Sequence, residues 1–329
     1  MLPGCCRLRC LLLVFIVWLA AGCAELPAGP EILERISISC EWANYPLIAS
    51  WVAEYGPQHP EIEFDVSAGD ACQGAGDVSV GGADIGLVSS QYLAEAAGHG
   101  LFTVPAAQDA ALLMVNCRNP VLKELDANGF SREVLHRIFL DADLTSWEEL
   151  STGMWADVPI HVYTRADTCS TAAALAEFLG GRQQDMAGIG VYGDLGLLEA
   201  IASDPLGIGY VTLAAVHSLE GGLPKSGVQV VPLDIDADGH IDPKERLQSE
   251  SEIDSAITQG EFPTPPAWEL YLVFAGKPTG RTAGFIRWIL TEGQAVAADA
   301  GYVALSQAQQ AYGLKRLGRW QPAALGRAD

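Results

Sequence analysis

PIHVYTRADTCSTAAALAEFL, residues 159–179, joins a strand-like run to a helix-forming run, with an arginine between them. The apolar pattern up to Arg165 predicts a strand, and the alanine- and leucine-rich run after Cys169 predicts a helix that Gly180 and Gly181 end. A helix N-terminus offers unpaired N–H groups and the positive end of a dipole, and Arg165 adds a permanent charge beside it. The stretch therefore predicts a site for an oxyanion.

A purely structural role explains the same residues equally well. Thr168 or Ser170 would cap the helix, while Asp167 would pair with Arg165 and favour the helix dipole. Asp167 suits an anion site only if it accepts a hydrogen bond from a ligand that still carries a proton, as phosphate does near neutral pH. The local chemistry leaves both interpretations open.

Strands and helices alternate along nearly the whole chain. The pattern predicts strands at 35–40, 61–69, 83–90, 110–117 and 159–165, helices at 45–55 and 170–179, and a long amphipathic segment at 282–300. Such alternation predicts an α/β fold of parallel sheets covered by helices on both faces, and the length suits two sheets. Ligands bind such folds at the carboxyl ends of the strands, here in the loops SCEWANYP, SAGDACQGAGD and YTRADTCSTAAAL.

The first 22 residues have the features of an export signal. Arg7 and Arg9 precede the apolar run LLLVFIVWLAA, which is too short to span a bilayer permanently. The run ends in LAAGC, which resembles a bacterial lipoprotein cleavage box. We therefore expect residues 1–22 to be removed and Cys23 to carry lipid, with residues 23–34 as a tether; an ordinary cleaved signal or an uncleaved anchor remains the alternative.

Composition narrows the function. The formal net charge of −22 argues against a nucleic-acid partner, because phosphate backbones require Lys and Arg for neutralisation. No nucleophile elbow, zinc-protease motif or nucleotide-binding loop is present in the sequence, which favours a binding protein over an enzyme.

The acidic stretch DIDADGHIDPKE, residues 234–245, has the spacing of a calcium-binding EF-hand loop. An apolar strand precedes it where an EF-hand has a helix, so we expect a structural calcium brace rather than a sensor. A solvated acidic turn before a helix that begins at Pro243 is the alternative. The expected ligands are the side chains of Asp234, Asp236 and Asp238, the carbonyl of His240, Asp242 through water, and Glu245.

Six stretches, in order between residues 36 and 306, resemble the phosphate-type solute-binding proteins of ABC transporters, in a short subgroup with an EF-hand-like loop. They include YPLIASWVAEYGPQHPEIEFDVSAG, ADIGLVSS, the opening stretch and VVPLDIDADGHIDPKE. The resemblance implies a type II periplasmic-binding-protein fold with two α/β lobes, mixed sheets flanked by helices and a hinge of crossing strands. Lobe 1 would contain residues 31–116 and 268–325, and lobe 2 residues 117–267.

The resemblance also implies a site and partners. The protein would be a monomer that captures phosphate or a similar oxyanion between its lobes and delivers it to a membrane permease. The family motif R-x-D-G-S-G-T places Arg165, Asp167 and Thr171 at the anion, with Cys169 at the usual serine. The other residues implied at the anion site are Ser39, Trp42, Ser89 and Ser170.

The chain departs from its relatives where they have glycine-rich loops. Glu41 and Asp70 bring negative charge toward the expected anion unless their side chains point away, and Ser90 follows Ser89 where a basic residue is usual. Cys40 and Cys72 replace expected glycines on neighbouring loops, so we hypothesise a disulfide bond between them. Two free thiols, or pairing of Cys169 with one of them, are the alternatives.

Three other functions stay open at this point. The same fold could bind a different ligand or have lost its ligand. A thiol-redox lipoprotein would use Cys169 as a thiolate at a helix N-terminus. A calcium-dependent structural lipoprotein would depend on the acidic loop instead.

Overall fold

A mixed nine-stranded sheet forms the centre of the computed structural model, which describes residues 34–318 except 99, 151–157, 219–226, 248 and 265. The strand order is β2-β1-β3-β11-β4-β8-β6-β7, and β9 pairs with β4. The strands are β1 (Glu34–Glu41), β2 (Ile62–Gly69), β3 (Ile85–Ser89), β4 (Phe102–Asn116), β5 (Phe130–Ser131), β6 (His161–Arg165), β7 (Ile189–Val191), β8 (Gly207–Thr212), β9 (Val228–Val230), β10 (Leu233–Asp234) and β11 (Ala267–Phe274).

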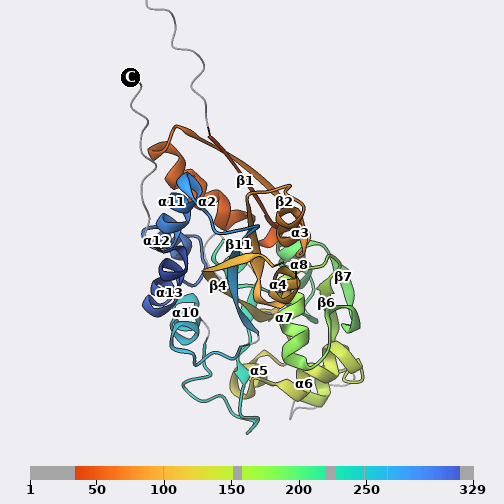
Figure 1. Cartoon of the computed structure of the whole chain (residues 1–329). Coiled ribbons are helices and arrows are strands. Elements are labelled where there is room, and N and C mark those ends of the chain that lie inside the picture. Colours follow the sequence, from red (N-terminus) through yellow and green to blue (C-terminus); the bar gives the residue numbers. More distant parts are fainter. Residues whose placement is uncertain are drawn as a thin grey trace, which may run out of the picture. The chain divides into compact units, whose positions relative to one another are not determined.

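The helices lie against the faces of this sheet (Figure 1). They are α2 (Tyr45–Tyr55), α3 (Gln73–Ser79), α4 (Leu93–Gly98), α5 (Leu122–Asn128), α6 (Arg132–His136), α7 (Ser170–Leu179), α8 (Gly193–Ser203), α9 (Leu213–His217), α10 (Glu250–Gln259), α11 (Gly280–Ile289), α12 (Gly293–Asp299) and α13 (Gln307–Leu317). The arrangement confirms the predicted α/β class. No helix of the described part is long and apolar enough to cross a membrane.

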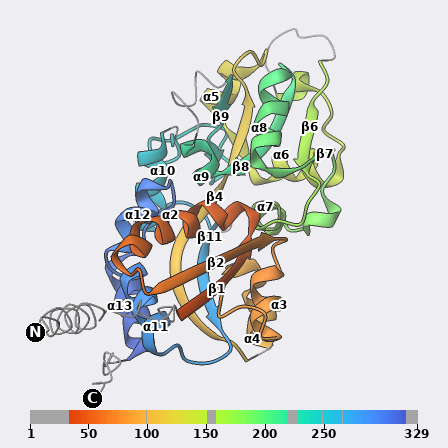
Figure 2. The same ribbon diagram turned by 90° about the horizontal axis from the view of Figure 1, so that it is seen from above.

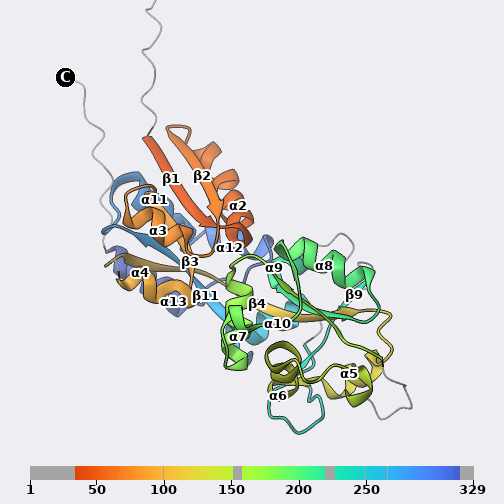
Figure 3. The same ribbon diagram turned by 90° about the vertical axis from the view of Figure 1, so that its right-hand side faces the viewer.

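The long strand β4 connects two lobes (Figure 2). Its first part, Phe102–Ala110, pairs antiparallel with β11, and its second part, from Ala111, pairs with β8 and β9. Lobe 1 therefore contains β1–β3, β11, α2–α4 and α11–α13, and lobe 2 contains β6–β9 and α5–α10; Figure 3 shows the same grouping. The lobe boundaries placed at residues 116 and 267 from the sequence stay a prediction.

The mixed sheets that the resemblance implied are confirmed, whereas the purely parallel pairing expected from the alternation is not. Nine strands form one mixed sheet, because the 15 residues of β4 are long enough to serve both lobes, and β10 and β5 form a separate two-stranded sheet. The amphipathic segment 282–300 contains parts of two helices, α11 and α12. Thr291 lies between them, and its hydroxyl donates to the carbonyl of Arg287 at 2.9 Å, a bond of the kind that bends or ends helices.

Helix α2 shows how the sequence pattern sets the packing. Leu47, Ile48, Trp51 and Tyr55 are buried on one face, as their helical spacing predicts. The Trp51 indole donates to the carbonyl of Gly293 at 2.8 Å and so connects α2 to α12. Burial of each such side chain stabilises the fold by about 1.5–3 kcal/mol. The packed helix in turn holds the loop that precedes α2 in place. That loop follows Glu41, the last residue of β1, and carries Trp42 into the cleft beside Arg165.

Candidate functional site

The strand-to-helix turn at residues 165–170 is buried at both ends, at Arg165 and at Cys169 and Ser170, whereas Ala166 and Thr168 are exposed. Strand β6 ends at Arg165, and α7 begins at Ser170. Cys169 caps the helix, since its sulfur accepts the backbone N–H of Ala172 at 3.4 Å. Neither of the caps expected from the sequence, Thr168 and Ser170, takes this role. The N–H and hydroxyl of Ser170 are therefore available to another acceptor.

Arg165 is almost completely buried and pairs with two carboxylates. Its guanidinium makes two hydrogen bonds to Asp167 and a third, of 2.9 Å, to Asp194. Burial lowers the pKa of Arg165, but the hydrogen bond to Asp167 and the charge of Asp194 raise it overall, so the group stays charged. Both oxygens of Asp167 accept hydrogen bonds from Arg165, as expected if Asp167 pairs with Arg165 rather than with a ligand. Sequence reasoning did not identify Asp194, which lies 29 positions from its partner.

The carboxylate of Glu41 lies at the start of α7. Its Oε1 accepts the backbone N–H of Ser170 at 2.8 Å, and its Oε2 accepts the Ser170 hydroxyl. Glu41 is only 2% exposed. Burial raises the pKa of Glu41 to about 7, although the bonds from Ser170 and the charge of Arg165 act to lower it. From the sequence we expected the charge of Glu41 to disfavour a bound anion unless its side chain pointed away. In the structure the Glu41 carboxylate accepts hydrogen bonds from Ser170, one of the residues predicted to bind the anion.

Three other predicted hydroxyl residues differ in their contacts. Ser89 Oγ lies 2.7 Å from Ser170 Oγ. Thr171 is fully buried, and its hydroxyl has no hydrogen-bond partner in the described structure. Ser39 instead donates to Asp77 at 2.6 Å, so its hydroxyl is engaged within lobe 1. We call Ser89, Ser170 and Thr171, with the neighbouring Arg165, the anion site.

A cleft of about 430 Å³ lies beside Arg165 and receives residues from both lobes. Trp42, which the sequence placed at the site, lines it and is 62% exposed. Tyr192 and Leu195 are exposed on the lobe 2 side and were not identified from the sequence. The remaining lining residues include Ala43, Pro46, Gly193, Asp194, Thr212, Ser218 and Tyr302. The cleft can therefore hold an organic group beside Arg165.

The structure contains no disulfide bond between Cys40 and Cys72. The buried Cys40 thiol lies 3.7 Å from the carbonyl oxygen of Ser67 on β2, where it behaves as a weak donor inside lobe 1. Burial raises the pKa of Cys169, outweighing the charge of Arg165, which acts to lower it. A protonated, buried thiol does not suit the redox function considered from the sequence.

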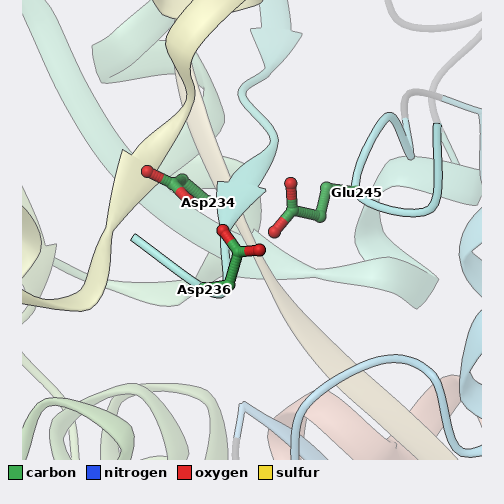
Figure 4. Close-up of side chains that lie close together, drawn as sticks. All are labelled: Asp234, Asp236 and Glu245. Carbon is green, nitrogen blue, oxygen red and sulfur yellow. The ribbon is translucent and has the colours of Figure 1, made fainter. Parts of the chain in front are cut away.

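The acidic loop brings three of its predicted metal ligands together (Figure 4). One carboxylate oxygen each of Asp234, Asp236 and Glu245 lies within 4.8 Å of the others. A hydrogen bond from the Asp238 N–H lowers the pKa of Asp236, but desolvation and the neighbouring carboxylates raise it overall. Accumulated negative charge of this kind is what a bound divalent cation neutralises. The donor set, carboxylate oxygens alone, suits calcium.

The rest of the loop is held by its own backbone. Gly239 has a φ of +82°, which supplies the sharp turn, and its N–H donates to Asp234. Asp238 accepts the N–H of His240 at 2.8 Å instead of joining the three converging carboxylates. Residues 243–245 form a turn, and the next helix is α10, so the helix expected at Pro243 is absent. Asp234 lies on β10, which pairs with β5 and fixes the first ligand position.

Comparison with known proteins gives one family match. The PBP superfamily domain model matches residues 27–292. No sequence among the curated proteins matches this chain. The family match covers both lobes and the acidic loop.

Solved structures share the fold at low sequence identity. One from Clostridium perfringens, provisionally named a phosphate ABC transporter substrate-binding protein and solved with bound phosphate, has a TM-score of 0.65 at 19% identity, over 83% of this chain and 100% of that one. An ABC-type phosphate transport receptor from Vibrio cholerae has a TM-score of 0.62 at 19% identity, over 82% and 99%. PstS from Borrelia burgdorferi has a TM-score of 0.52 at 15% identity, over 83% and 100%.

Proposed function

Because this chain belongs to the PBP superfamily, whose domain model spans residues 27–292, we propose that it is an extracytoplasmic solute-binding protein of an ABC transporter. Its ligand is an oxyanion, with phosphate as the first candidate, and it passes that ligand to a membrane permease. The names of the structures from Clostridium perfringens and Vibrio cholerae support this choice of ligand. The protein binds and does not catalyse.

One observation supports the site most directly. Two donors of Ser170, one backbone and one hydroxyl, converge on a pair of carboxylate oxygens. A phosphate presents oxygens of the same charge and similar spacing, and charge-assisted hydrogen bonds of this kind are about twice as strong as neutral ones. The two Ser170 donors that bind the Glu41 carboxylate would therefore also bind phosphate, once the Glu41 side chain has moved away.

Thr171 gives independent support. A buried hydroxyl without a partner costs about 1–3 kcal/mol relative to a satisfied one, so its retention calls for an explanation. Its position directly after Ser170, in the first turn of α7, makes a ligand oxygen the natural partner. The cost of the unpaired hydroxyl would then be recovered when the ligand binds.

The test is calorimetry with phosphate, sulfate and molybdate after removal of any ligand that co-purifies. We expect heat of binding with phosphate from the wild-type protein, and a loss of at least ten-fold in affinity for Thr171→Val. The fold should tolerate this nearly isosteric change. Thr282→Val, at the corresponding turn of α11, is the matched control and should bind like the wild type. No heat with any of the three anions would refute the oxyanion assignment.

A larger ligand is the second candidate, and the cleft beside Arg165 favours it. An organic phosphate or phosphonate would place its anionic group in the anion site and its organic part against Trp42 and Tyr192. Aromatic side chains at such positions contribute through large buried areas. Trp42→Ala should then weaken binding of a phosphate ester while leaving inorganic phosphate unchanged.

The lipid anchor belongs to the same proposal. Residues 1–22 and Cys23 lie outside the described residues, so the support is the sequence pattern alone. A lipidated Cys23 would hold the binding domain at the outer face of a membrane, near the permease. Detergent partitioning of the expressed protein tests this: the wild type should enter the detergent phase and Cys23→Ser should not.

We also propose that residues 234–245 bind one structural calcium ion. Asp234, Asp236 and Glu245 would ligate through their carboxylates, with Asp238, the carbonyl of His240 and Asp242 completing the set after small adjustments of the loop. The convergence of three carboxylates supports this role. Because the loop lies in lobe 2 after β10 and does not line the anion site, the ion would act as a brace.

A further inference from the structure

Glu41 connects the two lobes through the anion site. Its carboxylate, at the end of β1 in lobe 1, accepts two hydrogen bonds from Ser170, the first residue of α7 in lobe 2. Ser89 of lobe 1 contacts the same hydroxyl at 2.7 Å. These contacts are the ones that a bound oxyanion would make between the lobes.

We propose that Glu41 is a built-in substitute for the oxyanion: it holds the lobes together in the ligand-free protein and has to leave the anion site before ligand enters. The proposal rests on the proposed function, because it concerns the same site. It assigns a role to a carboxylate that lies buried near two others, Asp109 and Asp194.

The surroundings of Glu41 make its charge sensitive to pH. Burial opposes ionisation, while Ser170 and Arg165 favour it, and the resulting pKa of about 7 lies in the range where the protein would work. Protonated Glu41 carries no charge that opposes an incoming phosphate. The titratable and charged groups that face it are Arg165 on β6, Asp194 on α8, Asp109 on β4, Cys40 on β1, Cys169 before α7, and Tyr302.

A purely structural cap is the competing explanation. A carboxylate at a helix N-terminus stabilises the helix whether or not a ligand ever binds. However, the capping position of α7 is already taken by Cys169. A cap would lower stability when removed and leave phosphate affinity and lobe separation unchanged. A substitute ligand would change both.

The experiment compares the wild type with Glu41→Gly and Glu41→Gln. Small-angle scattering gives the radius of gyration with and without phosphate, and calorimetry gives phosphate affinity at pH 6 and pH 8. We expect Glu41→Gly to expand without ligand and to return to the wild-type radius when phosphate is added. At pH 8 both variants should bind phosphate at least ten-fold more tightly than the wild type, and this ratio should shrink at pH 6. Phosphate itself changes protonation between pH 6 and pH 8, but this change affects all the proteins equally. It therefore cancels in the ratio of variant affinity to wild-type affinity at each pH.

Glu63→Gln, an exposed residue of β2, is the matched control and should behave like the wild type. If Glu41→Gly keeps the wild-type radius and both variants keep the wild-type affinity, Glu41 is only a structural cap and the proposal fails. Should Glu41→Gly not fold, Glu41→Gln alone decides, since its unchanged affinity at pH 8 would overturn the proposal. Expansion of Glu41→Gly with no phosphate binding by any variant would support the contact between the lobes but refute the oxyanion function.

Discussion

Glu41 at the end of β1 and Ser170 at the start of α7 lie 129 residues apart in sequence and share two hydrogen bonds. The contact brings a negative charge to the donors that would otherwise receive a ligand. It also joins the lobes at the point where closure around a ligand would take place. Binding, closure and protonation are therefore expected to depend on one carboxyl group.

The pH dependence of stability should reveal Glu41. Its folded pKa of about 7 is raised above its ordinary value of 4.5, so its favourable contribution is full below about pH 4.5 and is lost as the pH rises through 7. The loss is on the order of 3 kcal/mol, from about 1.4 kcal/mol for each pKa unit. Urea unfolding between pH 5 and pH 8 should show this decline in the wild type and a smaller one in Glu41→Gln. An equal decline in both would mean that Glu41 titrates normally.

Arg165 should contribute strongly to the stability of the fold, in addition to its positive charge at the site. Arg165→Met would leave Asp167 and Asp194 without their partner, and breaking a buried ion pair in this way costs about 3–5 kcal/mol. Arg137→Met removes a solvent-exposed pair with Asp143 and should cost clearly less stability than Arg165→Met. Urea unfolding measures both. Similar losses of unfolding free energy in the two variants would show that the buried ion pair stabilises the fold no more than the exposed one.

Calcium should raise the melting temperature. Extracellular single sites bind with dissociation constants of roughly 0.1–1 mM, so 10 mM calcium would add about 1.4–2.7 kcal/mol of stability. We expect an increase of a few degrees for the wild type and almost none for Asp236→Asn, with phosphate affinity unchanged in both. Glu261→Gln, an exposed acid outside the loop, should respond like the wild type. Equal responses in all three proteins would exclude a specific site.

Cys169 should be unreactive in the folded protein. The side chain is fully buried, and burial raises its thiol pKa, so little thiolate is exposed to an alkylating reagent. Mass spectrometry after iodoacetamide treatment should find Cys169 modified only when the protein is unfolded. Fast modification of the native protein would revive the thiol-redox function.

Local sequence patterns predicted much of the fold. Helix α2 was predicted at 45–55 as observed, and α7 ends at Gly180, which adopts a φ of +89°. These elements follow from apolar spacing and from glycine, both of which act over a few residues. The merging of two expected sheets through β4 depends on pairing with β11 and β8, which are far away in sequence.

The candidate site was predicted in part for the same reason. Arg165, Ser170 and Thr171 belong to one continuous stretch, so a motif could identify them. Asp194 as a partner of Arg165, and Glu41 as a partner of Ser170, depend on contacts between distant segments. Glu41 was noticed as a departure from a glycine-rich loop, but its acceptor role depends on the contact between the end of β1 and the start of α7. Sequence periodicity indicates which face of an element is buried, but not which distant segment a buried side chain will contact.

The central claim, that the donors of Ser170 form an oxyanion site, has one most direct measurement. It is a crystal structure of the wild-type protein grown with phosphate at about pH 6, where Glu41 is largely protonated. We predict a phosphate oxygen that accepts the N–H and hydroxyl of Ser170, a second oxygen bonded to Thr171, and Glu41 moved away. Phosphate bound elsewhere, with both bonds between Glu41 and Ser170 intact, would contradict the claim.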